Sequence, residues 1–311
     1  MSETIEIGEA LTLHDETGLK VIDVGLRATL YFRNGHTIER RRGVAACFNE
    51  FFDMAGDELR WTIPTRLWPT GSSKRAAAAN LTTYLTAGDF DEEEGWEFGW
   101  HAGDTVDSAS TLMIDAYGVR AWQAAPPHNE LSLLTVMFPL TFFTERETGL
   151  PTLIARWASH LGALHGYGGI GLALSPDRFI ISRYGTKIIG LGMRFPGVEL
   201  DYPIHHALSC KQAIKGVNWV TVLASEFVET LGGASELGTR LGDQFVFTEY
   251  SDGLVIRAGA VPELGDRNRQ IPAPNYAALS KALKPVRISM HGPVHGISRE
   301  EFEDWLFRFD K

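Results

Sequence analysis

The sequence has only two cysteines, Cys47 and Cys210, among 311 residues, and this number excludes a disulfide framework. It also lacks a long hydrophobic run. The longest, LSLLTVMFPLTFF at residues 131–143, is too short to span a bilayer and contains Pro139. The first residues, MSETIEIGEALTLHDE, are acidic and have neither the basic nor the apolar region of a signal peptide. We therefore expect a cytoplasmic protein that does not contact a membrane.

Positive charge is scarce as well, because 29 basic residues stand against 39 acidic ones and the formal net charge is -10. Such a chain repels phosphates, so the composition disfavours nucleic acid as a partner and suits a basic protein. The 44% hydrophobic and 22% charged content is that of an ordinary globular protein. We expect one compact unit over residues 1–311, or two lobes over residues 1–125 and 126–311.

The familiar catalytic motifs are missing: the sequence contains no G-x-S-x-G, no Walker A loop and no H-E-x-x-H. HGYGGIGLALS does spell G-x-G-x-x-G, with Gly166, Gly168 and Gly171. A dinucleotide fingerprint needs a strand before the glycines and a helix after them. Here a stretch with helical spacing comes first and a short apolar stretch follows. We therefore interpret the glycines as a turn that joins a helix to a strand, and we expect no cofactor.

Histidines give no metal-binding pattern. His205 and His206 are adjacent, so they point in different directions, and His291 and His295 frame a loop rich in proline and glycine. Neither pair has a carboxylate or cysteine nearby at a recognised metal-ligand spacing. We interpret all four as surface or core histidines.

The loop ELGDRNR at residues 263–269 is the best remaining candidate for catalysis. A turn in which Asp266 and Asn268 bond to backbone groups is the favoured interpretation. An enzyme of unrecognised type, with a pocket near residues 263–269, remains the alternative function. A structural subunit of a larger assembly is a third.

The hydrophobic pattern predicts an α+β fold with a mainly antiparallel sheet and packed helices, or two lobes of similar plan. Residues 26–33 alternate as in a half-buried strand, and residues 131–143 are apolar on both faces, as in a central strand. Further strands are expected at 59–63, 111–117, 170–174, 178–183 and 187–191, with a hairpin turn at Asp252–Gly253. Helices are expected at 44–55, 150–164, 217–231 and 275–283, and after a Ser298–Glu301 capping box.

The segment GDFDEEEGWEFGW at residues 88–100 combines dense acidic charge with alternating aromatic residues. It can be a solvated acidic turn that leads into a strand with buried aromatics. Alternatively it is a binding edge, at which charge steers a basic partner and a tryptophan anchors it. The candidate partner-binding residues are Asp89, Asp91, Glu92, Glu93, Glu94, Trp96 and Trp100.

An ordered set of sequence elements resembles the bacterial type VI immunity family, most clearly over residues 130–311. The elements are HGYGGIGLALS, RFPGVELDYP, IKGVNWVTVL, LGG, GLVIRAGAVPELGDRNR, LSKALKPVRI and WLFRFD. The resemblance implies a protein that binds and neutralises a toxin delivered by type VI secretion, and it brings no catalytic residues. It also implies architectural roles for the three glycines in a turn, for Trp219 on a helix and for Gly265–Asp266 in a loop.

On this basis we expect an immunity protein whose partner is its cognate effector toxin. The acidic chain favours a basic toxin, and a nuclease that acts in the cytoplasm is the favoured kind, because surfaces that cut nucleic acid are basic.

Overall fold

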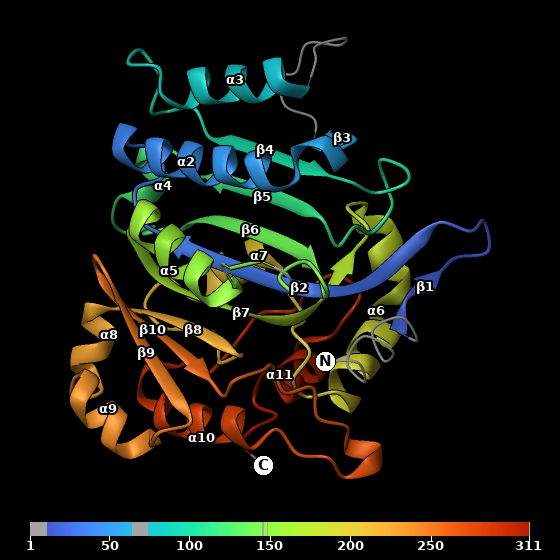
Figure 1. Ribbon diagram of the computed structural model, residues 1–311, viewed down its shortest axis with the longest axis vertical. Helices are drawn as coiled ribbons and strands as arrows, with labels where there is room; N and C mark the ends of the chain where they lie inside the picture. Colours follow the sequence, from blue (N-terminus) through green and yellow to red (C-terminus); the bar gives the residue numbers. More distant parts are fainter. Residues whose placement is uncertain (1–10, 64–73, 145, 148, 311) are drawn as a thin grey trace.

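The protein folds around one ten-stranded sheet whose strands all pair antiparallel with their neighbours, which confirms the predicted fold class (Figure 1). The computed structural model describes residues 11–63, 74–144, 146–147 and 149–310. The strand order is β3-β4-β5-β6-β2-β7-β8-β10-β9, and β1 pairs with β2 beside this path. The sheet continues across the predicted lobe boundary, because β2 lies between β6 and β7.

The strands are β1 (Leu13–His14), β2 (Lys20–Phe32), β3 (Trp61–Ile63), β4 (Trp96–His101), β5 (Met113–Gly118), β6 (Ser132–Pro139), β7 (Ala163–Leu174), β8 (Val220–Ala224), β9 (Phe245–Tyr250) and β10 (Gly253–Ala258). The helices are α2 (Ile38–Ala55), α3 (Lys74–Leu85), α4 (Ala121–Ala124), α5 (Leu150–Leu161), α6 (Arg178–Arg194), α7 (Pro203–Ser209), α8 (Ser225–Thr230), α9 (Ala234–Leu241), α10 (Pro274–Ala282) and α11 (Arg299–Leu306). Short 3-10 helices lie at η1 (Gly56–Glu58), η2 (Arg267–Arg269) and η3 (Lys284–Val286). None of the helices in the described ranges is long and apolar enough to cross a membrane.

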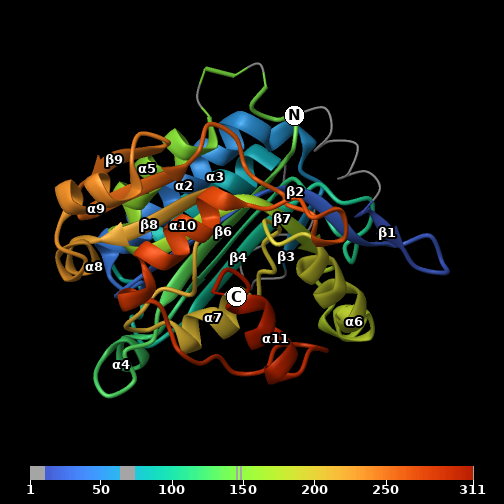
Figure 2. The same ribbon diagram turned by 90° about the horizontal axis from the view of Figure 1, so that it is seen from below.

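Helices cover the two faces of the sheet differently. Helices α2, α3 and α5 lie on one side, which we name the front face, and α6, α7 and α11 lie on the other, the back face (Figure 2). The front face is an apolar core in which the ring of Phe48 on α2 lies 4.9 Å from that of Trp100 on β4. The amphipathic α5 adds Leu153, Ile154 and Trp157, all buried. Burial of these side chains supplies the main driving force for folding.

Strand β2 is the centre of the sheet and is buried on both faces. From Val24 to Phe32 all nine residues are buried, including Arg27 and Thr29 on the back face. The prediction of a half-buried strand at residues 26–33 is therefore wrong. The alternation of polar and apolar residues is real, but the polar row packs against back-face polar groups instead of meeting water.

The glycine motif lies inside strand β7, so the predicted glycine turn is also wrong. The turn that joins α5 to β7 is made by Gly162 alone, whose φ of 53° is the left-handed conformation that favours glycine. The motif glycines instead let neighbouring atoms approach closely. A Cβ on Gly168 would lie 2.5 Å from Cδ1 of Ile154, and one on Gly166 would lie 2.6 Å from the carbonyl oxygen of Thr29.

Two further predictions exchanged helix and strand. Residues 178–183 and 187–191 form the single helix α6, which begins at Asp177, whose carboxylate accepts a hydrogen bond from the backbone N–H of Phe179 at 2.7 Å. Residues 217–231 are split between strand β8 and helix α8, and Trp219 directly precedes the strand instead of lying on a helix. Strand β8 is buried on both faces, so its sequence shows no alternation to separate it from a helix.

Other predicted elements are confirmed. Strands β9 and β10 form the hairpin, and β6 is a central strand that ends earlier than expected, at Pro139. Helices α2, α5 and α10 lie where the periodicity places them. The capping box of α11 is present, with the Ser298 hydroxyl accepting from the N–H of Glu301.

The close approach of β7 to α5 yields the first prediction. Gly168→Val should lower the free energy of unfolding by about 1–3 kcal/mol, because the added side chain overlaps Ile154 across a packed interface. Gly190→Ala is the matched control: this exposed glycine of α6 has no atom within 4 Å of an added Cβ. That change should stabilise by about 0.5–1 kcal/mol through helix propensity. Urea denaturation measures both, and a neutral Gly168→Val would contradict the packing described.

Candidate partner-binding surface

The acidic segment forms an ordered, exposed turn between α3 and β4. We name residues 89–94 the acidic loop; its five carboxylate side chains are all exposed, and they belong to Asp89, Asp91, Glu92, Glu93 and Glu94. The carboxylate of Asp91 accepts from the N–H of Glu93 at 2.9 Å, and its carbonyl accepts from the N–H of Glu94 at 3.0 Å. This turn holds the carboxylates together at one end of β4. Their contact with a partner stays a prediction.

The tryptophans that follow the acidic loop are buried, so they do not offer the exposed anchor that the sequence suggested. Trp96 is 3% exposed and Trp100 is 4% exposed. The indole N–H of Trp96 donates to the carbonyl of Gly35 at 3.3 Å, and the Trp96 ring stacks on that of Phe98. Strand alternation explains the correction: the three aromatic residues of β4 share the front face, where they fasten the strand to α2 and its loop.

An exposed tryptophan that sequence reasoning missed lies next to the acidic loop. Trp122 on α4 is 48% exposed. The N–H of Ala121 donates to the carbonyl of Glu92 at 2.9 Å, which ties α4 to the acidic loop. The Trp122 ring lies 5.4 Å from that of His128. One tryptophan in a single helical turn creates no periodic pattern, so only the three-dimensional fold reveals this neighbourhood.

A hollow of about 330 Å³ continues this surface from α4 toward α7. The loop at residues 127–129 forms one wall, and the segment 208–213 forms the other. Lys211 Nζ donates to the carbonyl of His128 at 2.7 Å and so links the two walls of the hollow. Leu208, 53% exposed, adds an apolar side chain at the rim. Carboxylates, an exposed indole and an apolar rim therefore lie together at one end of the sheet.

The back face is held by a buried carboxylate, Asp201, that accepts hydrogen bonds from three side chains. The donors are Arg27 Nε, the Thr29 hydroxyl and the Tyr167 hydroxyl, each at 2.5 Å. Burial alone would raise the pKa of Asp201, but the charges of Arg27 and Lys215 and these hydrogen bonds lower it below its ordinary value. Asp201 therefore stays ionised. Its three donors join the segment that contains it to strands β2 and β7, and we call this role a structural pin.

A second buried ion pair extends this cluster. Lys215 pairs with Glu199, and Glu199 also accepts from the side-chain amide of Asn218 at 2.9 Å. The Lys215 ammonium lies 3.6 Å from the centre of the Tyr167 ring, a cation–π contact. We name these groups, together with Asp201 and its donors, the back-face polar cluster.

The two histidine pairs of the sequence meet in space. Nδ1 of His206 lies 2.9 Å from Nε2 of His291, and the rings of His205 and His295 lie 4.6 Å apart. Burial lowers the pKa of His206 and of His291, so both are neutral at pH 7. Among the described residues, no group of three or more histidine, cysteine, aspartate or glutamate side chains is arranged to hold a metal ion.

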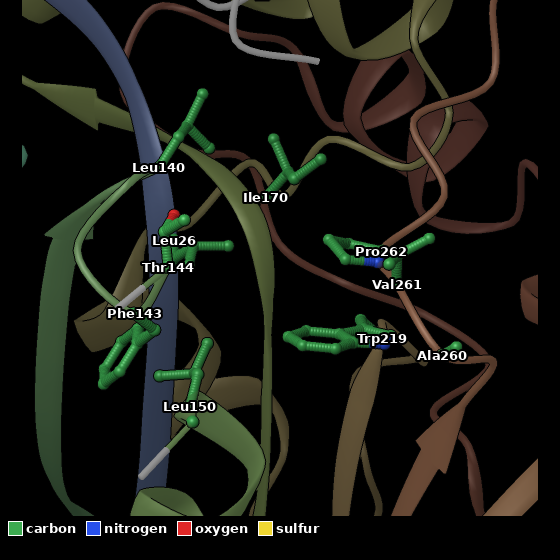
Figure 3. Close-up of a pocket in the computed structure, with 11 residues that line it drawn as sticks. Leu26, Leu140, Phe143, Thr144, Leu150, Ile170, Trp219, Ala260, Val261 and Pro262 are labelled. Carbon is green, nitrogen blue, oxygen red and sulfur yellow. The ribbon is translucent and has the colours of Figure 1, made fainter. Parts of the chain in front are cut away.

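The loop at residues 263–269 is a turn, as the favoured interpretation predicted. Asp266 caps η2 by accepting from the N–H of Asn268 at 2.9 Å and of Arg269 at 3.4 Å, and it pairs with Arg194. A cavity of about 290 Å³ lies beside the preceding residues, 260–262 (Figure 3). Its described lining is mostly apolar and includes no titratable side chain. Among the described residues this lining has no acidic or basic side chain, Thr144 supplies its hydroxyl, and residues 263–269 do not take part in it.

Comparison with known proteins identifies the family of the chain. The family described as type VI immunity for VRR-NUC matches residues 43–309. The chain therefore belongs to this family, which confirms the resemblance drawn from the sequence. Among solved structures, the Pseudomonas aeruginosa T6SS protein PA0821 superposes with a TM-score of 0.82 at 26% sequence identity, covering 99% of this chain and 90% of that chain. Comparison with curated proteins finds no match.

Asp201 gives a prediction about stability. Asp201→Asn should lower the free energy of unfolding by about 3–5 kcal/mol, because it leaves the buried Arg27 charge without its counterion. Glu226→Gln is the control: its ion pair with Arg33 is about half exposed on both sides, so its loss should matter by less than about 1 kcal/mol. Equal effects in chemical denaturation would show that Asp201 is not a structural pin.

His165 gives a prediction about pH. Burial lowers its pKa to about 4, and its Nε2 lies 2.9 Å from the carbonyl oxygen of Cys210. The unfolded chain binds the proton more tightly, with a pKa of about 6.5. The stability that the neutral, buried His165 provides is therefore fully present above pH 6.5 and is lost as the pH falls toward 4. The free energy of unfolding should fall by about 3 kcal/mol over that range from this group alone.

The variant His165→Gln should flatten that pH profile. His160→Gln, at an exposed histidine in the last turn of α5, should keep the wild-type slope. Denaturation curves at a series of pH values measure both variants, and parallel profiles for wild type and His165→Gln would contradict the prediction.

Proposed function

We propose that the protein binds the VRR-NUC effector of a type VI secretion system and neutralises it by occupancy, without transforming a substrate. Membership of the immunity family over residues 43–309 is the observation that carries this proposal. On the back face, the buried side chains of Arg27, Thr29 and Tyr167 all donate to Asp201, and the described cavity lining is mostly apolar. Both features suit a rigid binding protein.

The proposed effector is a basic nuclease. A surface that handles nucleic acid carries positive charge to meet phosphates, and this chain has a formal net charge of -10. Opposite charge accelerates encounter and favours the correct partner. Because the substrate of such an effector is nucleic acid, we expect the two proteins to meet in the cytoplasm.

The proposed contact surface is the acidic loop together with Trp122. The carboxylates would steer the effector, and the exposed indole would be buried on binding, as anchor residues at protein interfaces often are. Trp122 thus takes the role that the sequence suggested for Trp96 and Trp100, whose burial leaves them within the core.

The mode of action is tested by titration. Purified protein is added to the nuclease domain of the cognate effector, and DNA and RNA cleavage is measured. Neutralisation by occupancy predicts that inhibition is complete near one equivalent of the protein. Full inhibition at a few per cent of the effector concentration would show catalytic detoxification and would contradict the proposal.

The acidic loop is tested by association kinetics. Replacing Asp91, Glu92, Glu93 and Glu94 by serine should slow association most at low salt and change dissociation less, because exposed charges act over a screening length of about 10 Å at 0.1 M salt. The thermal melt serves as the control for folding. Association that is as fast as wild type at low salt would exclude the acidic loop from the encounter.

The indole is tested by truncation. Trp122→Ala should weaken binding by on the order of 2 kcal/mol and leave the melting temperature nearly unchanged, because the side chain is half exposed in the free protein. Phe179→Ala is the matched control, since this aromatic side chain is 68% exposed on α6, at the other end of the sheet from α4 in both views (Figures 1 and 2). If both truncations leave affinity unchanged, Trp122 is no anchor.

A further inference from the structure

The back face of the sheet is partly exposed along β5 and at Glu97 near the start of β4, whereas Gly99 and His101 further along β4 are buried. On β6 and β2 the back-face side chains are buried, with Thr135 and Thr29 at 0% exposure. On β5, by contrast, Met113, Asp115 and Tyr117 are only partly buried, although the alternate residues facing α2 are fully buried. The described helices of the back face therefore stop short of these two strands. We name the exposed side of β4 and β5 the open sheet face, formed by Glu97, Met113, Asp115 and Tyr117.

Asp115 lies in the middle of the open sheet face and lacks a partner for one oxygen. Its Oδ1 is buried and accepts no hydrogen bond from any described residue. In register it stands opposite Gly99 on β4, which has no side chain to donate, and Thr135 on β6, whose hydroxyl bonds to that of Thr29 at 3.0 Å. A carboxylate with one buried oxygen and no donor there is unfavourable when ionised, and a positive charge placed on the exposed side of Asp115 would stabilise it.

The charges around Asp115 attract a cation. Glu97 lies on the adjacent strand one pair further on, opposite Tyr117. The charge of Arg27 lowers the pKa of Asp115, but the guanidinium of Arg27 is paired with Asp201. Burial, and secondly the charge of Glu97, raise the pKa of Asp115 to about 7. A basic group placed at this point would favour the ionised carboxylate and bind it.

The open sheet face is continuous with the surface already described. Trp96 and Gly118 pair at the ends of β4 and β5, so the acidic loop enters β4 and α4 leaves β5 at the same end of the sheet. Glu97 and Tyr117 form the next pair inward, and Asp115 follows. Helix α4 lies on the same side of the sheet as α7 (Figure 2). A partner that contacts the acidic loop and α4 can therefore also contact the open sheet face.

We propose that the open sheet face receives an arginine or lysine side chain from the basic surface of the effector, with Asp115 as its counterion and Tyr117 and Met113 as its apolar walls. The proposal rests on the proposed function and names the recognition contact within it. Arginine suits the position best, because a guanidinium can donate to the exposed side of the carboxylate and stack on a tyrosine ring. An ion pair between this basic side chain and Asp115 would slow dissociation of the effector from the protein.

The test uses surface plasmon resonance to measure binding of the full-length protein to the catalytically inactivated VRR-NUC domain of the cognate effector. Asp115→Asn keeps the shape and removes the charge, and it should weaken binding by at least about tenfold, mainly through faster dissociation. Glu249→Gln is the matched control, because this exposed carboxylate lies on β9 at the opposite edge of the sheet. It should bind as wild type does.

Folding is checked separately. Asp115→Asn should melt at or above the wild-type temperature at pH 8, because it removes a partly buried carboxyl whose charged form is disfavoured in the folded state. Its affinity should also be less sensitive to pH between 6 and 8 than that of wild type. Wild-type affinity should fall as the pH drops below 7, because protonation of Asp115, set by burial, Glu97, Arg27 and Asp201, removes the counterion.

The outcomes separate the two proposals. Wild-type affinity in Asp115→Asn, with Glu249→Gln also unchanged, would overturn the open sheet face as the recognition site while the immunity function stands. A wild-type protein that does not bind the inactivated domain would overturn the proposed function itself, and this contact with it. A double-mutant cycle against alanine variants of the basic residues of the effector should show strong coupling of Asp115 to one of them, and the absence of any coupling would contradict the proposal.

Discussion

The carboxylate of Asp201 is the constraint on which the back half of the structure depends. It gathers donors from the two central strands, with Arg27 and Thr29 on β2 and Tyr167 on β7, and so fixes the segment that leads into α7 against the sheet. A buried arginine needs such a counterion, and a buried aspartate needs such donors. The back face is therefore covered where these groups meet. Cover ends beyond β6, and the open face of β4 and β5 results from that limit.

The front face follows the opposite rule. Most of its buried side chains are apolar, and the ion pair that joins α2 to α5, Glu50 with Arg156, is partly exposed. The segment at residues 88–100 shows how one stretch serves both environments: the carboxylates remain in solvent in a turn, while the alternating aromatic residues of β4 enter the core. The contact surface that we propose therefore consists of a loop, a single helical turn and a partly exposed row of sheet residues.

Sequence reasoning found the elements that have one buried face. Helix α5, the hairpin and the capped α11 all follow from simple periods and turn residues. It failed at β8 and at the glycines of β7, where both faces are buried and the pattern has no polar side to mark the period, and it predicted two strands where α6 lies. Strand β6, also buried on both faces, was recognised from its apolar run. It placed the acidic loop correctly on the surface. Asp115, Asp201 and Trp122 were beyond its reach, because their importance depends on neighbours that are distant in sequence.

The most direct test of the central claim is a structure of the complex with the VRR-NUC effector, determined by crystallography or cryo-electron microscopy. We expect the effector to cover the end of the sheet that carries the acidic loop and α4, with its basic surface over β4 and β5. Contacts confined to the opposite edge, at β9 and α9, would contradict the assignment of this surface, and the basis of recognition would then lie in another part of the protein.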